Sequence, residues 1–333
     1  MFLSLIAILV EFIVFLVFLV LFVAACIMYY YNMRTKWQYS DDDFHWRFPV
    51  QEITSVHYNV LLDQHVHTIY KGGNLTIRQN IRWHVANGYN ALFLTEHNCI
   101  QPEAEFEAII QEFAGQVVIL QGMEWTTERI HMNFLGIKEW TAPIPEHPSD
   151  QDIQEAIQAA HDQEALVVVN HPHEQAKKAA DHPSFSDLAS WGVDYIEIAS
   201  QGFFDAKAAR LCGKDPGSKF GAIAGTDIHF PIPVNCWTAL NVASFTREAI
   251  MDELRAKLTE VIYYEKGTPD FTTRLIPRKM HKMALFMSIG KIFCTVNRSQ
   301  LEIHWNMAGK VLLLLAGLFW LLQVLAAFIL IFF

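Results

Sequence analysis

The sequence contains few cysteines and few charged side chains. The five cysteines among 333 residues show no pairing pattern, so nothing indicates a fold held together by disulfides. Basic residues are also in the minority, with 25 Lys and Arg against 35 Asp and Glu and a formal net charge of −10. A non-specific nucleic-acid binder normally carries the opposite sign. We therefore expect no nucleic-acid partner beyond, at most, a nucleotide substrate.

Charge is almost absent from the two ends of the chain. Residues 1–31 contain one charged side chain, Glu11, and residues 311–333 contain none. Because about 20 apolar residues cross a bilayer core, these runs predict transmembrane helices over 1–31 and 308–333. A cleaved signal peptide, the alternative for the first run, would need a basic segment and a small-residue cleavage site, and neither is evident.

The residues that flank the two apolar runs predict an orientation. Arg34 and Lys36 follow the first run, and Lys310 precedes the second. The positive-inside rule then places the region between them in the cytoplasm. The sequence thus predicts a two-pass integral membrane protein with a cytoplasmic central domain.

Two segments connect the central region, residues 55–270, to the apolar ends. Residues 32–54 include the acidic sequence YSDDDF and predict a solvated linker. Residues 271–307 are basic, and within them 274–298 combines basic residues with an apolar stretch too short to span. This pattern is typical of a helix that lies on an anionic membrane surface, which would make membrane lipid a partner. Packing against the central domain is the alternative.

The central region alternates short apolar runs with helical patterns. Helices are predicted over 75–88, with Gly88 as the stop, and over 148–163, with Ser149 or Asp150 as the N-cap. Strands that are apolar on both faces and lie between helices are typical of a parallel sheet with covered faces. We predict an α/β fold, a closed or nearly closed β/α barrel of about seven units, with an open doubly wound sheet as the alternative. The predicted strands are 57–63, 90–95, 116–122, 131–137, 165–170, 193–199 and 220–225.

Histidines and acidic residues follow these runs directly. In barrels and open α/β sheets, reactive groups lie just past the carboxyl ends of the strands. Imidazole and carboxylate suit zinc, manganese or iron, and clustered cations of this kind hydrolyse phosphoesters. His131 instead opens a run, which puts it nearer the opposite end unless the preceding turn returns it, and His84 and His161 are interpreted as surface residues of helices. The residues after the runs are His65, His67, Glu96, His97, Glu124, His171, His173, Asp227 and His229.

Several motifs together resemble the polymerase and histidinol phosphatase (PHP) superfamily. The family patterns are D-x-H-x-H-T, T-D-H, G-x-E, H-x-x-G, H-P and G-S-D-x-H. The resemblance covers about residues 55–265 and implies a distorted seven-stranded β/α barrel that hydrolyses phosphoesters with two or three divalent metal ions (Zn, Mn or Fe). The matching sequences, in the family's order, are DQHVHT, LFLTEHN, GMEWTT, IHMNFLGI, VVNHPH and GTDIHFP.

The resemblance also implies roles for individual residues. Glu124 corresponds to a carboxylate that bridges two metal ions, and Glu96 and His173 are candidates for orienting a ligand or moving a proton. A structural hydrogen-bonding role is the alternative at each position. The metal ligands implied by the resemblance are His65, His67, His97, Glu124, His131, His171, Asp227 and His229.

The sequence departs from the family pattern at two places. Gly72 stands where many members have an aspartate ligand, so one metal position could be weakened or empty. In the branch that acts on nucleotides an arginine follows the H-P motif, whereas His173, Glu174 and Gln175 stand here. A nucleotide substrate is therefore doubtful.

Three classes of function follow from these patterns. The favoured one is a metal-dependent phosphoesterase that uses a metal-activated hydroxide on a phosphorylated small molecule or a lipid-linked substrate. The alternatives are a catalytically silent, metal-binding membrane scaffold or sensor, and a hydrolase of another bond such as an amide. Because histidines must be deprotonated to bind metal, activity should fall on acidification.

Overall fold

The computed structural model describes residues 39–213 and 218–269 and, outside these ranges, residues 13, 15–17, 19–29, 294–297, 300–303, 306, 309, 310 and 317. The chain divides into two compact units. One is Tyr39–Thr273, and the other combines Met1–Gln38 with Arg274–Phe333. All of the predicted site residues lie in the first of these units.

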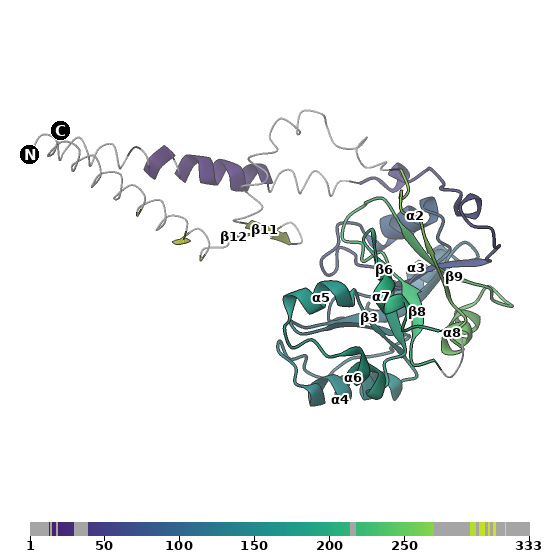
Figure 1. The fold of residues 1–333 in the computed structure, drawn as a ribbon. Coiled ribbons are helices and arrows are strands. Elements are labelled where there is room, and N and C mark those ends of the chain that lie inside the picture. The colour runs from purple at the N-terminus through teal and green to yellow at the C-terminus, as the bar shows by residue number, and fades with distance from the viewer. Residues whose placement is uncertain are drawn as a thin grey trace, which may run out of the picture. The chain divides into compact units, whose positions relative to one another are not determined.

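One mixed sheet of ten strands organises the larger unit (Figure 1). β1, β2 and β3 run parallel to one another, as do β5, β6 and β8, whereas β4 and β9 are antiparallel to their neighbours. In spatial order the strands are β10 (Glu260–Tyr263), β9 (Cys236–Leu240), β1 (Val60–Asp63), β2 (Ala91–Leu94), β3 (Val118–Thr126), β4 (His131–Leu135), β5 (Leu166–Val169), β6 (Tyr195–Ser200) and β7 (Phe203–Phe204), while β8 (Gly221–Ala224) pairs with β6.

The sheet curves into a nearly closed barrel. The hydroxyl of Thr238 on β9 accepts a hydrogen bond from the Ala224 amide on β8 (2.8 Å) and donates one to the Ala224 carbonyl (2.9 Å). The barrel prediction is thus met in its coarse form, but the expectation of an all-parallel sheet is wrong. β3 and β4 are joined by residues 127–130 alone, and a parallel crossover needs a dozen or more residues.

The helices lie between the strands in sequence. α2 begins after Thr76, whose side chain accepts a hydrogen bond from the Gln79 amide, and Ser149 caps α4 in the same way. Both predicted helices are therefore present. The helices of this unit are α2 (Ile77–Ala86), α3 (Glu103–Glu112), α4 (Asp150–His161), α5 (Pro172–Lys178), α6 (Phe185–Ser190), α7 (Ala206–Ala209) and α8 (Arg247–Arg255), with short 3-10 helices η1 (Asp41–Asp43) and η2 (Val50–Glu52).

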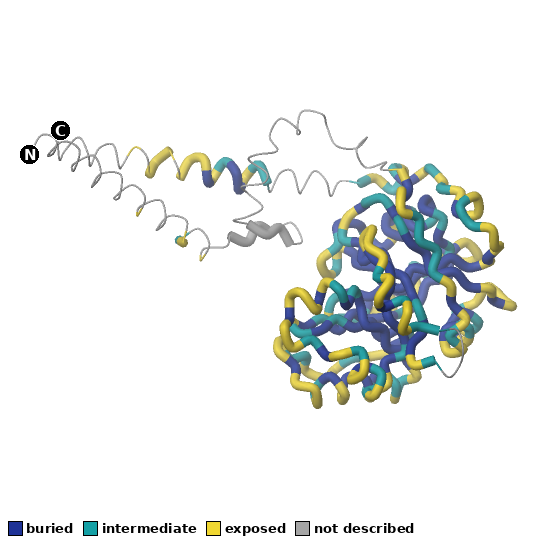
Figure 2. Tube along the Cα trace, in the orientation of Figure 1, coloured by how far each residue is buried: buried dark blue, intermediate teal, exposed yellow. Residues whose placement is uncertain are grey.

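Alternation along the strands explains why both faces of the sheet are apolar. Leu62 and Phe93 pack in one cluster with residues from most of the other strands, whereas their neighbours Leu61 and Leu92 pack with α2 and α3. Val167 likewise packs with α4. One face of each strand thus fills the barrel and the other supports the helices, and Figure 2 shows buried strands beneath more exposed helices.

The predicted membrane topology is contradicted. Among the residues that the structure describes, no helix is long and apolar enough to cross a membrane. Nearly all of 308–333 lies outside the described residues. The two-pass assignment and the cytoplasmic placement derived from it are therefore withdrawn.

The predicted interfacial helix lies almost wholly outside the described residues and stays a prediction. Within 274–298 the structure describes Cys294–Asn297, and these residues form strand β11, which pairs antiparallel with β12 (Gln300–Ile303). The remainder of the segment lies outside the described residues. A lipid partner stays a prediction.

Candidate metal centre

The predicted ligands meet at one edge of the barrel. His65 and His67 follow β1, His171 follows β5, and Asp227 and His229 follow β8. The chain direction explains the position of His131, which opens β4. Because β4 runs antiparallel to β3 and β5, its first residue lies at the edge where those strands carry their own polar residues.

The carboxylate of Glu124, on β3, lies at the centre of this group and is fully buried. Asn170 donates a hydrogen bond to its Oε1 atom at 3.1 Å. A carboxylate with several imidazoles around both of its oxygens is suited to bridging cations. The ring nitrogens nearest to Glu124 belong to His97 (2.5 Å), His131 (3.1 Å), His65 (3.3 Å), His67 (3.5 Å) and His171 (3.6 Å).

Asp227 supplies a second carboxylate to the same space. Its Oδ1 atom lies 3.0 Å from Nε2 of His67 and 3.3 Å from Nε2 of His65. Its backbone has a φ of +48°, a conformation uncommon for a residue with a side chain. Gln201 donates a hydrogen bond to Oδ2 at 2.5 Å, and Nε2 of His171 lies 3.8 Å from the same oxygen.

Four overlapping groups of side chains offer ligand atoms that lie within 4.8 Å of one another. Glu124, His65, His67 and His171 each belong to two groups, as expected where cations share ligands. All of the predicted ligands are in at least one group, although their role as ligands stays a prediction. The groups are His67, His97 and His229; His65, His171 and Asp227; His65, His67 and Glu124; and Glu124, His131 and His171.

Several of these buried atoms lack a hydrogen-bond partner. Among the described residues, none forms a hydrogen bond with Nε2 of His65, with either ring nitrogen of His67, or with Oδ1 of Asp227. The 3.0 Å between His67 and Asp227 is close, but the two atoms are not aligned for a hydrogen bond. Buried polar atoms are nearly always partnered in proteins. The donor set therefore fits cations that would occupy the space between these atoms.

The protonation of the cluster follows from burial and charge. Burial lowers the pKa of His67 to about 3, so its ring is neutral and can donate a lone pair. Burial acts on His65 in the same direction, but Asp227, Glu197 and Glu124 outweigh it and raise the pKa of His65 well above its usual value. The buried carboxylates thus require a positive charge, which a cation would supply in place of a proton.

Glu96 is turned away from the cluster and toward the loop that follows β1. Its carboxylate accepts hydrogen bonds from the Thr68 amide (3.0 Å) and hydroxyl, the Lys71 amide (3.1 Å) and the Gln101 side chain (2.9 Å). Burial raises the pKa of Glu96 to about 7, against the effect of these hydrogen bonds. Glu96 therefore holds the loop in place, and its proposed part in proton transfer stays a prediction.

His173, the other predicted catalytic residue, lies on α5 beside the cluster rather than within any of its groups. Its ring stacks on Phe203 with 4.1 Å between ring centroids. Proton transfer by His173 likewise stays a prediction.

Gly72 lies directly against the cluster. A Cβ atom at this position would be 3.1 Å from Cδ2 of His97 and 3.3 Å from Cδ2 of His229, and the backbone φ is +94°. The group formed by His67, His97 and His229 consequently contains imidazoles alone, without a carboxylate. The sequence departure thus lies against the cluster of candidate ligands.

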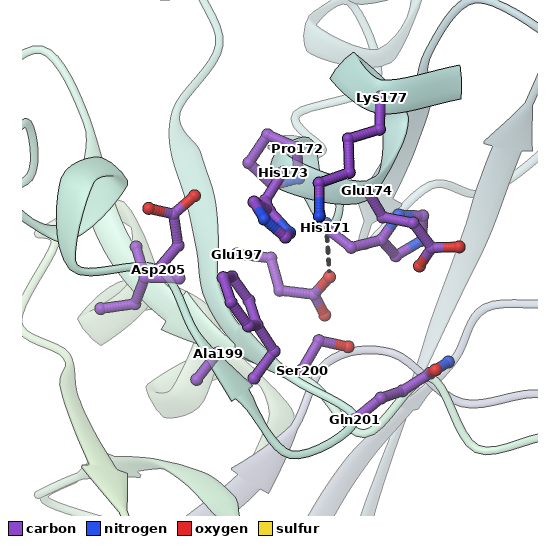
Figure 3. Close-up of a pocket in the computed structure, with 12 residues that line it drawn as sticks. His171, Pro172, His173, Glu174, Lys177, Glu197, Ala199, Ser200, Gln201 and Asp205 are labelled. Atoms are coloured by element: carbon purple, nitrogen blue, oxygen red, sulfur yellow. Dashed lines mark hydrogen bonds between the residues drawn. The ribbon is translucent and has the colours of Figure 1, made fainter. Parts of the chain in front are cut away.

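Sequence reasoning missed Glu197 on β6. Its Oε1 atom lies 3.1 Å from Nδ1 of His65, and its Oε2 atom accepts a hydrogen bond from the His171 amide at 2.7 Å (dashed in Figure 3). Glu197 thereby leaves Nε2 of His65 facing the cluster. The available signal was an acidic residue between Ile196 and Ile198 in the run VDYIEIA.

Asp63 and His84 form a second buried support. Asp63 accepts hydrogen bonds from the His65 and Thr226 amides, both at 3.0 Å, and so ties the ends of β1 and β8 together. Nε2 of His84 lies 3.0 Å from the same carboxylate. His84 is fully buried, so its assignment to the protein surface is wrong. An isolated histidine in a helical pattern gives no sign that the far side of the helix meets a buried acid.

Comparison with known proteins gives a similarity of fold. No family model and no curated protein matches the sequence. A two-domain protein from Bacteroides vulgatus that contains a predicted PHP-like metal-dependent phosphoesterase is 19% identical, with a TM-score of 0.51 over 64% of this chain and 68% of that one. The similarity at this identity concerns the fold, and it agrees with a barrel of the PHP type.

Two further solved structures are more distant. A candidate metal-dependent phosphoesterase from Bifidobacterium adolescentis is 13% identical, with a TM-score of 0.43 over 59% of this chain and 96% of that one. An amidohydrolase from Chromobacterium violaceum, with bound sulfate and no metal, is 17% identical, with a TM-score of 0.40 over 61% and 97%.

Proposed function

We propose that this chain is a metal-dependent phosphoesterase that hydrolyses phosphoesters of small molecules. The observation that carries the proposal is the set of overlapping ligand groups around Glu124, in which buried imidazole nitrogens have no hydrogen-bond partner among the described residues. The fold, which is similar to that of the Bacteroides vulgatus protein, is consistent with it.

The ligands would be the histidines and carboxylates of the four groups, and two or three divalent ions (Zn, Mn or Fe) suit their number and type. Glu124 would bridge two ions, because both of its oxygens face imidazoles. When bound, the cations supply Lewis-acid stabilisation of charge on a phosphoryl group and lower the pKa of water.

Other residues of the chain would prepare this site. Glu197 orients His65, and Asp63 fixes the spacing between the β1 and β8 ends. His173 is the side chain that we assign to exchange a proton with the leaving oxygen, because it lies beside His171 without belonging to any ligand group.

A metal-binding protein without catalytic activity is the second candidate. The observation that favours it is Gly72, which leaves the group of His67, His97 and His229 without a carboxylate. A cation held there by neutral ligands alone would be bound less tightly than one that is also held by a carboxylate.

Metal analysis of the full-length protein combined with turnover of 4-nitrophenyl phosphate tests both candidates. We expect two or three bound metal ions, turnover, and a loss of about 100-fold or more in activity for His65→Ala and Asp227→Ala. His147→Ala is the matched control, because His147 is an exposed histidine that pairs with Glu128 (2.6 Å) and belongs to none of the ligand groups. Metal without turnover of any phosphoester would favour the silent protein, and a chain that binds no metal would exclude both candidates.

A further inference from the structure

A pocket of about 230 Å³ opens beside the metal centre, between α5 and the hairpin of β6 and β7 (Figure 3). His171 belongs both to the pocket wall and to two of the ligand groups. A molecule that placed one end among the ligand groups could therefore extend its other end into this pocket.

The wall of the pocket is largely apolar and includes stacked rings. Pro172, Ile198 and Phe203 line it, and the Phe203 ring lies nearly parallel to that of His173, at an interplanar angle of 16°. Phe203 is 45% exposed, so the protein leaves much of a large apolar side chain uncovered next to its metal centre. Aromatic side chains of this kind bind planar rings by stacking.

Ser200 gives an independent sign that a ligand belongs here. Its side chain lines the pocket, is 8% exposed, and its hydroxyl has no hydrogen-bond partner among the described residues. Buried hydroxyls are nearly always satisfied in proteins. The next residue along the hairpin, Gln201, holds Asp227 through a 2.5 Å hydrogen bond, so the pocket wall and the metal centre share one structural element.

The charge of the wall limits what the pocket can accept. Three carboxylates, those of Glu174, Glu197 and Asp205, line it together with one ammonium group, that of Lys177. A second phosphate would meet an excess of negative charge there, whereas an uncharged group would not. The volume also restricts size, since a cavity of about 150 Å³ can hold benzene.

We propose that this pocket holds the leaving group of the substrate, and that this leaving group is uncharged and built on a single planar ring. The inference rests on the proposed function, because it places the phosphoryl end at the metal centre. Phe203 would then determine specificity by stacking on the ring, and the Ser200 hydroxyl would bind a polar substituent.

Two neighbouring phenylalanines allow a matched test. Phe203 and Phe204 are consecutive in β7 and both exposed, but Phe204 is not part of the pocket wall and its ring lies against Tyr263, 5.2 Å between centroids. With metal-loaded full-length protein, we expect Phe203→Ala to lower kcat/KM for phenyl phosphate by about five- to tenfold more than for ethyl phosphate, because any effect through its stacking on His173 is common to both esters. Phe204→Ala should leave both unchanged. Equal losses for the two esters, or equal effects of the two substitutions, would overturn the proposal.

A binding measurement separates the pocket from the reaction. Calorimetric titration of the wild-type protein with phenylphosphonate and methylphosphonate, neither of which is hydrolysed, should show about five- to tenfold tighter binding of the phenyl compound. Phe203→Ala should remove that difference. If it does so in a protein that hydrolyses no phosphoester, the proposed function fails while the pocket assignment stands. If the two phosphonates bind equally, or neither binds, the pocket assignment fails whatever the activity.

Discussion

The two ends of the barrel are built on opposite principles. At one end, Ile250, Met251 and Leu254 of α8 close the apolar interior, and the hydroxyl of Tyr195 donates a hydrogen bond to the Leu254 carbonyl. At the other end, buried imidazoles and carboxylates crowd together, and His67 has no hydrogen-bond partner for either ring nitrogen among the described residues. Burial of unpaired polar groups costs free energy of folding. One end therefore stabilises the fold, and the other keeps an arrangement whose cost a ligand would offset.

The largest effect is expected at the centre of the polar end. Glu124→Gln keeps the size of the side chain but removes the charge that the surrounding imidazoles face. We expect loss of bound metal and a fall in activity of about 1,000-fold, equivalent to about 4 kcal/mol of transition-state stabilisation. Metal analysis and kcat/KM measure the change. Full metal content in this variant would show that Glu124 is not a ligand.

A substitution at the apolar end should lower the stability of the protein and leave metal binding unchanged. Leu254→Ala removes a fully buried side chain from the cluster that α8 forms with the strands. We expect the free energy of unfolding to fall by about 3 kcal/mol, because the transfer and cavity terms add. The folded variant should bind as much metal as the wild type. Denaturant titration and metal analysis of the same sample test the separation, and a variant that lost metal while folded would refute it.

The fold was largely predictable because burial leaves a regular trace in the sequence. Each of the seven predicted strands is present, since strands covered on both faces appear as short apolar runs. Of the ten strands in this sheet, β7, which has two residues, β9 and β10 were missed. β9 is the sequence CWTAL, in which Thr238 interrupts the apolar residues, and β10 is only partly buried, so neither reads as a continuous apolar run. The direction of β4 could not be predicted from periodicity, which is the same for parallel and antiparallel strands.

The candidate ligands were predictable because they lie at strand ends. The residues that hold those ligands in place through hydrogen bonds were not predictable. Nε2 of His65 and Oδ1 of Asp227 lie 3.3 Å apart, although 162 positions separate the two residues in sequence. Glu197 and His84 gave no comparable signal, because each acts through a partner that the tertiary fold alone brings near.

The support for His65 should have an intermediate effect. Glu197→Gln retains the shape of the side chain but weakens its hold on Nδ1 of His65. We expect metal affinity to fall by about 10- to 100-fold, the usual effect of losing a carboxylate that orients a ligating histidine. Competition with a chelator measures it. Glu112→Gln serves as the control, because Glu112 pairs with Arg78 at the surface. An equal effect of both substitutions would show that Glu197 does not support metal binding.

The smallest effect is expected from a histidine at the apolar end, His161 on α4. Its Nε2 atom lies 3.0 Å from Oδ2 of Asp194, and this hydrogen bond raises the pKa of His161 against the effect of partial burial. A raised pKa in the folded state means that the pair stabilises the protein fully below the unfolded value of about 6.5 and that this contribution is lost as the pH rises through the folded value. His161→Ala should therefore lower the free energy of unfolding by about 0.5–1 kcal/mol at pH 5 and by less at pH 9. Denaturant titration at the two pH values measures the difference, and metal binding should not change.

A cost independent of pH would mean that His161 contributes by packing alone. The expected pH dependence would show that a histidine at the apolar end titrates with a partner, in contrast to the unpaired His67 at the polar end.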